Sequence, residues 1–342
     1  MVTTKDIAER LHLSVSTVGR ALADDARISE QTKLRVRQAA AEMGYVGNLA
    51  ARMMRGASSN VVGLVIPDIR NSFYVTIAHE LSTIMVAQNF QLMLAETNDD
   101  RTTELRQLRE LAASRVAGIA IVPTSRPHGD SVKLLAGIPH VQLLRKHASL
   151  GSQWFGLDDH RALRDATRHL IELRHTRIGY IGGPAERSTG RQRLEGYRQA
   201  LHDGNVPDRE GPLELGPPSS VEHGREAIGR LLARSPAPTA VVCGSVQHTV
   251  GVMDGLFRMG VKVPGELSIV GLGDETGFFW WGPGLTTVSL PIKEIAASCG
   301  LWLVRRLTSG PGEDGPYASV SPGSLVLRGS TAPPASVRKR SV

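Results

Sequence analysis

A run of hydroxyl side chains surrounds one guanidinium near the start of the chain. Ser14, Ser16 and Thr17 precede Arg20 in the stretch SVSTVGR. Hydroxyls donate and accept hydrogen bonds, whereas the planar guanidinium only donates, through a fork of N–H groups. Such a set suits an acceptor-rich, negatively charged partner, and the stretch holds no histidine or carboxylate that could act as a general base. It predicts recognition rather than catalysis.

Motifs that would indicate an enzyme are incomplete elsewhere. Gly182-Gly183 is not followed by the Lys-Ser or Lys-Thr of a phosphate loop, and His79 lacks a second histidine at zinc-helix spacing. No Gly-x-Ser-x-Gly elbow occurs. Cys243 lies in a strand-like run and Cys299 in a helix-like run, which favours buried, reduced thiols. We therefore expect no enzyme, no cofactor and no metal.

Composition narrows the class of protein further. The 342 residues favour two or more cores with a hinge. The net charge of +7 suits a polyanionic partner, although residues 338–340 of the basic tail, 336–342, supply part of it. The sequence shows no secretory signal pattern and no apolar stretch of about 18 residues. We expect a cytoplasmic, nucleoid-associated protein that makes no membrane contact.

Three short helices are expected around the hydroxyl cluster. A hydroxyl residue precedes each of them: Thr3 or Thr4, then Ser14, then Ser29. Gly44 ends the third. The apolar positions recur at helical spacing and predict one shared core made of Ile7, Ala8, Leu11, Val18, Ala21, Leu22, Leu34, Val36, Ala39, Ala40 and Met43. The second helix then presents a different set outward, namely Val15, Ser16, Gly19 and Arg20.

Two interpretations of residues 1–45 are open at this point. In an ordinary helical subdomain the hydroxyls are caps and solvated surface, and no face is special. In a helix-turn-helix domain the second helix enters the DNA major groove, and side chains at its start reach base edges.

The run TTKDIAERLHLSVSTVGRALADDARISEQTKLRVRQAAAEMGYVGNLAARMMRG resembles the N-terminal region of the lactose-repressor/galactose-repressor (LacI/GalR) family of transcription factors. The resemblance implies that Val15, Ser16 and Arg20 read bases, with Arg20 able to hold a guanine edge by two hydrogen bonds. It also implies a set of residues that hold the phosphate backbone: Thr3, Ser14, Thr17, Arg27, Tyr45 and Asn48.

Residues 46–60 form a hinge and linker in this interpretation. In the family the segment becomes helical against the minor groove when two copies meet on a palindromic operator, and a leucine wedges into a base step. This chain has Met54 at that position, and Ala51 matches the small residue that permits close approach. A plain linker is the alternative.

From Val61 onward, short apolar runs alternate with helical patterns, which predicts doubly wound parallel sheets. The segments VPGELSIVGLGDE and GPGLTTVSLPIKEIA resemble the family's effector-binding core, which is similar to periplasmic sugar-binding proteins. The resemblance implies a core at 61–335 with two lobes, one from 61–158 and 290–320, the other from 159–289 and 321–335. Crossovers are expected near 158–160, 289–291 and 319–321.

The resemblance also implies a ligand between the lobes, at the carboxyl ends of the strands. Arg193 matches an arginine that grips ligand hydroxyls or a carboxylate. The other candidate effector residues are Asn71, Phe73, Arg145, Asp158, Ser245 and Asp274.

Two departures from the family pattern concern the effector. Ser245-Val246 stands where an Asn-Asp or Ser-Asp pair is common, and Gly273-Asp274 where Asp-Asp is common, so acceptors for neutral sugars are lost. The GLGDE form is similar to members that respond to gluconate-like acids. A sugar acid is the resulting hypothesis, because arginines 145 and 193 can supply cationic partners.

The resulting expectation is a homodimeric bacterial regulator, a repressor of sugar or sugar-acid genes. It should bind a pseudopalindromic double-stranded operator and respond to a small molecule bound between the lobes. The alternative is a sugar-binding receptor without DNA function. Deletion of residues 1–57 separates the two, because a pure receptor keeps all its activity.

Overall fold

The computed structural model describes residues 2–45, 59–207, 211–217, 220–309 and 317–335. The chain divides into two compact units, Met1–Ser59 and Asn60–Val342. Within these ranges no helix is long and apolar enough to cross a membrane.

Three helices form the described part of the first unit: α1 (Thr4–Leu11), α2 (Val15–Leu22) and α3 (Glu30–Glu42). Thr3 and Asp6 form a reciprocal capping box at α1. The Ser14 side chain accepts a hydrogen bond from the N–H of Thr17 at α2, and Ser29 caps α3 in the same way. The expected caps are confirmed, with Thr3 rather than Thr4 at the first helix.

The shared core of this unit contains Ile7, Ala8, Val18, Ala21, Val36, Ala39 and Ala40. Two expected positions are wrong. Leu34 is 64% exposed. The inner stripe of α3 instead passes through Lys33, whose ammonium is paired with Glu30 at 2.6 Å and with Asp24 at 3.1 Å. Gly19 is buried rather than outward, because it lies beside Val18 on the covered arc of α2.

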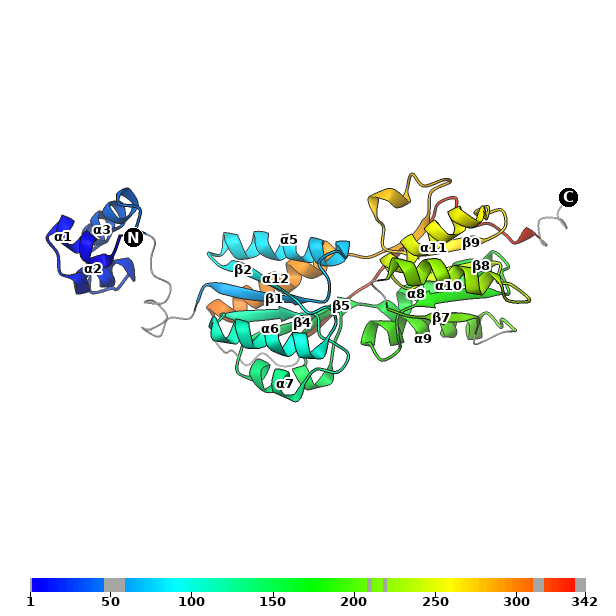
Figure 1. Cartoon of the computed structure of the whole chain (residues 1–342), viewed down its shortest axis with the longest axis horizontal. Helices are drawn as coiled ribbons and strands as arrows, with labels where there is room; N and C mark the ends of the chain where they lie inside the picture. The colour runs from blue at the N-terminus through cyan, green and yellow to red at the C-terminus, as the bar shows by residue number, and fades with distance from the viewer. Residues whose placement is uncertain (1, 46–58, 208–210, 218–219, 310–316, 336–342) are drawn as a thin grey trace. The chain divides into compact units, whose positions relative to one another are not determined.

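The second unit contains two six-stranded sheets, each with helices on both faces (Figure 1). Lobe 1 is the sheet β11-β5-β4-β3-β1-β2 with its helices, and its described strand pairs are parallel. Its strands are β1 (Val61–Ile66), β2 (Gln91–Glu96), β3 (Gly118–Ile121), β4 (His140–Leu143), β5 (Trp154–Leu157) and β11 (Ala318–Ser321). Its helices are α5 (Ser72–Ala87), α6 (Arg101–Ala113), α7 (Gly129–Ala136) and α12 (Ile292–Thr308).

The buried strand β1 shows how side-chain alternation builds lobe 1. Val62, Leu64 and Ile66 belong to the cluster that includes residues of α5 and α12. Val61 and Val65 belong to the cluster on the other face, with residues of α6 and α7. Because both faces are covered, all six positions of the strand are buried.

Lobe 2 is the sheet β12-β10-β9-β8-β6-β7 with its helices. Its strands are β6 (Ile178–Gly182), β7 (Leu213–Leu215), β8 (Ala240–Cys243), β9 (Ser268–Leu272), β10 (Thr286–Ser289) and β12 (Ser324–Val326). Its helices are α8 (Asp159–Glu172), α9 (Ser188–Asp203), α10 (Val221–Leu232) and α11 (Val246–Met259). Cys243 in β8 and Cys299 in α12 are buried and unbonded, which confirms the expected free thiols.

The chain passes between the lobes three times: between β5 and α8, between β10 and α12, and between β11 and β12. One strand departs from the expected parallel arrangement, because β12 pairs antiparallel with β10. The reason is the path of the chain. Strand β10 leaves lobe 2 for lobe 1, whereas β12 enters lobe 2 from lobe 1, so the two strands run in opposite directions.

Candidate DNA-contacting face and effector cleft

The start of α2 presents its side chains to solvent. Val15 is 48% exposed, and Ser16 and Arg20 are exposed as well. Arg20 donates from Nε to the carbonyl of Ser16 at 3.3 Å, which folds its stem along the helix. Within residues 2–45, no carboxylate forms an ion pair with Arg20. This guanidinium is therefore available to an outside acceptor.

The hydroxyls of α2 already support the helix. Ser14 Oγ lies 2.8 Å from Ser16 Oγ and 2.7 Å from Thr17 Oγ1. Thr3 is engaged similarly with Asp6 at the start of α1. A phosphate that approaches these residues meets hydroxyl groups and the positive end of a helix together, an arrangement suited to anions.

Two other predicted backbone contacts differ in their surroundings. Arg27 is ion-paired with Asp25, with Nε 2.9 Å from Oδ1 and Nη2 2.6 Å from Oδ2. This pair holds the pKa of Asp25 well below its usual range, so a phosphate would share Arg27 with that carboxylate. Tyr45 is half-buried against the helical core. Asn48, Ala51 and Met54 lie outside the described residues.

A cavity lies between the two lobes, where several strands end and helices begin. It measures about 50 Å³, enough for a few water molecules. Its lining comes from the start of α5, the loop after β4, the start of α9 and the start of α11: Asn71, Phe73, Tyr74, Leu144, Arg145, Thr189, Arg193, Ser245 and Val246. A sugar-sized ligand requires this space to widen.

Arg193 is held on the lobe 2 side of the cavity by two hydrogen bonds. Nε donates to Asp159 Oδ1 at 2.6 Å, and Nη1 donates to the carbonyl of Gly244 at 2.9 Å. The Asp159 side chain is 1% exposed, and its Oδ2 has no hydrogen-bond partner among the described residues. Burial raises the pKa of Asp159, while Arg193 opposes that rise. The pair fixes one guanidinium at the cleft.

Arg145 supplies a second guanidinium, from lobe 1. It is 6% exposed, and Nη1 donates to Asp99 Oδ1 at 2.7 Å. Asn71 accepts a hydrogen bond from the N–H of Phe73 at 3.0 Å and so caps α5. Phe73 packs against the hydrophobic cores of both lobes. The cleft is thus lined by cations, helix starts and two aromatic rings, those of Phe73 and Tyr74.

Five of the predicted effector residues meet at this cavity: Asn71, Phe73, Arg145, Arg193 and Ser245. Asp158 does not, because its carboxylate accepts a hydrogen bond from the N–H of Arg161 and caps α8. The next residue, Asp159, is the carboxylate that faces Arg193.

Asp274 also lies away from this cavity. It is ion-paired with Arg328 and accepts a hydrogen bond from Thr287 at 2.8 Å. It lines a separate polar hollow of about 650 Å³ near the crossovers, together with Ser72 and Lys293.

Sequence reasoning missed four lining residues: Tyr74, Leu144, Thr189 and Val246. The sequence spacing could have indicated one of them. Thr189 precedes Arg193 by one helical turn, and residues at this spacing share a helix face. Among the described residues, no group of three His, Cys, Asp or Glu side chains could hold a metal ion.

Comparison with known proteins covers both parts of the chain. Residues 3–48 match the model for bacterial regulatory proteins of the lacI family, and residues 167–331 match a periplasmic binding protein-like domain. The chain is 32% identical over 340 residues to the HTH-type transcriptional regulator DegA of Bacillus subtilis, spanning 97% of this chain and 98% of DegA. It is 31% identical over 297 residues to the HTH-type transcriptional regulator GalR of Salmonella typhimurium, spanning 86% of each.

Solved structures show the same architecture. The lac repressor dimer bound to operator and the anti-inducer ONPF aligns with a TM-score of 0.82 at 22% identity, over 97% of this chain and 99% of that chain. A complex of the transcriptional regulator CelR with cellobiose aligns with a TM-score of 0.70 at 26% identity, over 97% of this chain and 100% of that chain.

A helix-turn-helix unit followed by a two-lobed, periplasmic-binding-protein-like core defines a DNA-binding transcriptional regulator with an effector-binding core. The chain belongs to the LacI family of bacterial regulatory proteins. It is therefore not an enzyme, and it is not the receptor without DNA function that the core alone would allow.

Proposed function

We propose that this regulator binds a pseudopalindromic operator as a homodimer. Val15, Ser16 and Arg20 would contact base edges in the major groove, because they are the exposed side chains at the start of α2. The predicted phosphate contacts remain Thr3, Ser14, Thr17, Arg27, Tyr45 and Asn48. Ala51 and Met54 would enter the minor groove from the hinge. Because the operator would lie on the chromosome, we propose a cytoplasmic location.

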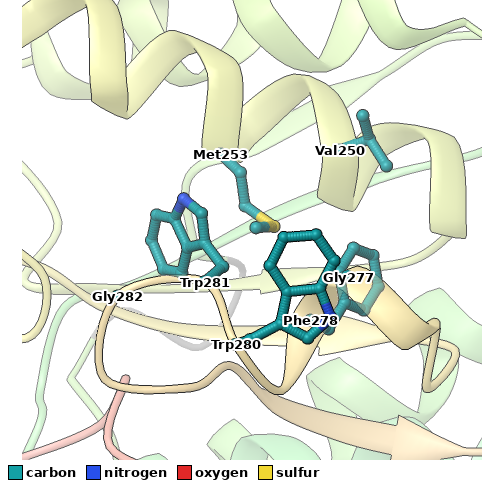
Figure 2. A pocket seen from close by; sticks show the side chains of 7 residues that line it. All are labelled: Val250, Met253, Gly277, Phe278, Trp280, Trp281 and Gly282. Atoms are coloured by element: carbon teal, nitrogen blue, oxygen red, sulfur yellow. The ribbon is translucent and has the colours of Figure 1, made fainter.

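The dimer proposal is supported by an apolar surface on lobe 2. Figure 2 shows Trp280 and Trp281 on the loop below α11, with Met253 between them. The hollow there measures about 370 Å³. Trp280 is 68% exposed, and Phe257 at the end of α11 is 79% exposed. Exposed apolar side chains of this kind mark an interaction site, and a twofold dimer would bury the same residues on each copy.

We further propose that the effector is an anion of sugar-acid type. The observation that carries this proposal is the convergence of two guanidiniums, Arg145 and Arg193, with the starts of α5, α9 and α11 at one cavity. Helix starts and guanidiniums both favour negative charge. Binding would bias lobe closure and so alter operator affinity, and by linkage the operator would alter effector affinity by the same factor.

Calorimetry with matched pairs of acids and neutral sugars tests the effector class. Gluconate with glucose and galactonate with galactose form such pairs, and glucuronate extends the series. We expect an acid to bind at least ten-fold more tightly than its neutral partner. Tighter binding of a neutral sugar than of every acid would overturn the proposal, with cellobiose included because CelR is seen in complex with it.

A further inference from the structure

A carboxylate lies at the end of the helix that carries the predicted base readers. Asp25 belongs to the loop between α2 and α3, and its backbone N–H donates to the carbonyl of Arg20 at 3.1 Å. The preceding residue, Asp24, has a φ of +58°, a left-handed conformation that aspartate tolerates better than most residues. These features fix the backbone of Asp25 beside the last turn of α2.

Asp25 binds Arg27 through both of its carboxylate oxygens. Nε of Arg27 donates to Oδ1 at 2.9 Å, Nη2 donates to Oδ2 at 2.6 Å, and the backbone N–H of Arg27 also donates to Oδ1 at 2.9 Å. The arginine side chain is 75% exposed, whereas that of Asp25 is 19% exposed. A long exposed side chain usually samples many rotamers. This two-point ion pair instead holds the guanidinium of Arg27 in one geometry.

The neighbouring charges distinguish Asp25 from the carboxylate next to it. Asp24 pairs with Lys33 of α3 at 3.1 Å and so supports the helical core. Hydrogen bonds from Arg27 hold the pKa of Asp25 well below its usual range, and the nearby charge of Arg20 lowers that pKa further. Asp25 therefore lies in direct contact with one predicted DNA-contacting arginine and in the electrostatic field of another.

A negative charge at this place has different effects on two kinds of duplex. Phosphates are repelled by Asp25 and must compete with it for Arg27, so binding to DNA of any sequence is weakened. On a duplex that α2 has bound in its base-reading register, a phosphate meets Arg27 in the geometry in which it is already held, and this contact costs less entropy. Because only the second effect depends on fit, the carboxylate increases the difference in affinity between a fitting and a non-fitting duplex.

We propose that Asp25 is a positioning residue that determines DNA specificity: it presents Arg27 to one operator phosphate and weakens attachment to other DNA. The inference rests on the contacts proposed above for Arg20 and Arg27. A purely structural ion pair would only support the loop between α2 and α3, and its loss would act alike on every duplex.

Asp25→Asn separates these roles, because it removes the charge and keeps the size of the side chain. On a scrambled duplex, affinity should rise about three-fold. The slope of log K against log salt concentration on that duplex should steepen by about 0.9, since Arg27 becomes free to bind a phosphate. On the preferred operator, affinity should fall about three-fold. The ratio of the two affinities should thus fall about ten-fold.

Two further variants complete the set. Asp25→Glu keeps the charge and lengthens the side chain, so it should lower operator affinity and leave affinity for the scrambled duplex at the wild-type value. Glu9→Gln, at an exposed carboxylate of α1, makes the same change in net charge as Asp25→Asn and is the matched control. It should leave the ratio of the two affinities unchanged.

Fluorescence anisotropy of the full-length protein measures both affinities between about 50 and 200 mM KCl. The operator is the duplex that the protein enriches from random DNA, and the scrambled duplex has the same length and composition. Circular dichroism checks that each variant is folded.

An unchanged ratio in Asp25→Asn, while Arg27→Ala weakens binding to both duplexes, overturns the inference and leaves the proposed contact of Arg27 standing. Equal losses on both duplexes in Asp25→Asn identify a structural ion pair and also overturn it. If Arg27→Ala changes binding to neither duplex, the proposed contact itself fails, and the inference fails with it.

Discussion

Arg193 Nε lies 2.6 Å from Asp159 Oδ1 in lobe 2. The arginine side chain is 12% exposed and the aspartate side chain is 1% exposed. The pair ties the start of α8 to the first turns of α9. It also fixes the direction of a guanidinium that lines the effector cleft. Because each charge of the pair compensates the other, removal of one of them should affect both the stability of the protein and its binding of an acid.

Arg193→Gln should destabilise the protein by about 3 kcal/mol, because it leaves a buried carboxylate unpaired. The double variant Arg193→Gln with Asp159→Asn should be more stable than Arg193→Gln alone, although neither should bind an acid. Burial raises the pKa of Asp159, so the loss in Arg193→Gln should shrink as pH falls and that carboxylate is protonated. Urea unfolding at pH 8 and pH 5 measures this. A double variant less stable than the single one would contradict the account.

His248 should make lobe 2 sensitive to acid. It lies in the first turn of α11 and is buried against the loop before α10, where its Nε2 lies 2.9 Å from the carbonyl oxygen of Pro217. Burial lowers its pKa from 6.5 to about 4. Between pH 6.5 and pH 4 the unfolded chain therefore binds a proton at this histidine that the folded chain does not bind. The free energy of unfolding should fall by about 1.4 kcal/mol for each unit by which the pH is lowered through this range.

His248→Gln should flatten this part of the pH profile, because glutamine does not titrate. Urea midpoints of wild type and variant, compared at pH 7.5 and pH 5, provide the measurement. His202→Gln, which changes an exposed histidine, is the control and should keep the wild-type slope. Parallel profiles for wild type and His248→Gln would show that this histidine does not cause the sensitivity.

Local patterns predicted much of the fold. The caps Thr3, Ser14 and Ser29 follow from hydrogen bonds within three residues, and the alternating runs of the core follow from burial on both sheet faces. The direction of β12 could not be predicted in this way, because it depends on which lobe the chain has just left.

The site was harder to predict for a physical reason. Asp158 and Asp159 are neighbours in sequence, yet one caps a helix and the other pairs with Arg193, a choice made by packing in three dimensions. The ion pair between Arg187 and Asp99, which joins the two lobes, could not be predicted either, because the two residues are distant in the sequence.

Arg20→Ala should relax base preference at one position of each half-site. The expected loss on the preferred operator is about 1–3 kcal/mol, whereas binding to random duplex should change little. Arg35→Ala removes an exposed arginine from α3 and serves as the charge-matched control. Fluorescence anisotropy on both duplexes at fixed salt measures the effect. Equal losses on specific and random DNA would count against Arg20 as a base reader.

Trp280→Asp should shift the protein from dimer to monomer. A tryptophan anchor at an interface typically contributes about 2 kcal/mol or more, and a buried carboxylate adds a further penalty. Sedimentation equilibrium across protein concentrations measures the shift, and operator affinity should fall with it. Leu301→Asp, at a 61% exposed apolar residue of α12, is the control. An unchanged dimer in Trp280→Asp would exclude this face of lobe 2 from the interface.

The most direct test of the whole account is selection of bound duplexes from random DNA by the full-length protein, with and without the acids and sugars named above. We expect one enriched pseudopalindrome with two half-sites, bound at least about a thousand-fold more tightly than bulk DNA, with an affinity that changes when an acid is added. The absence of any preferred duplex under every one of these conditions would contradict it.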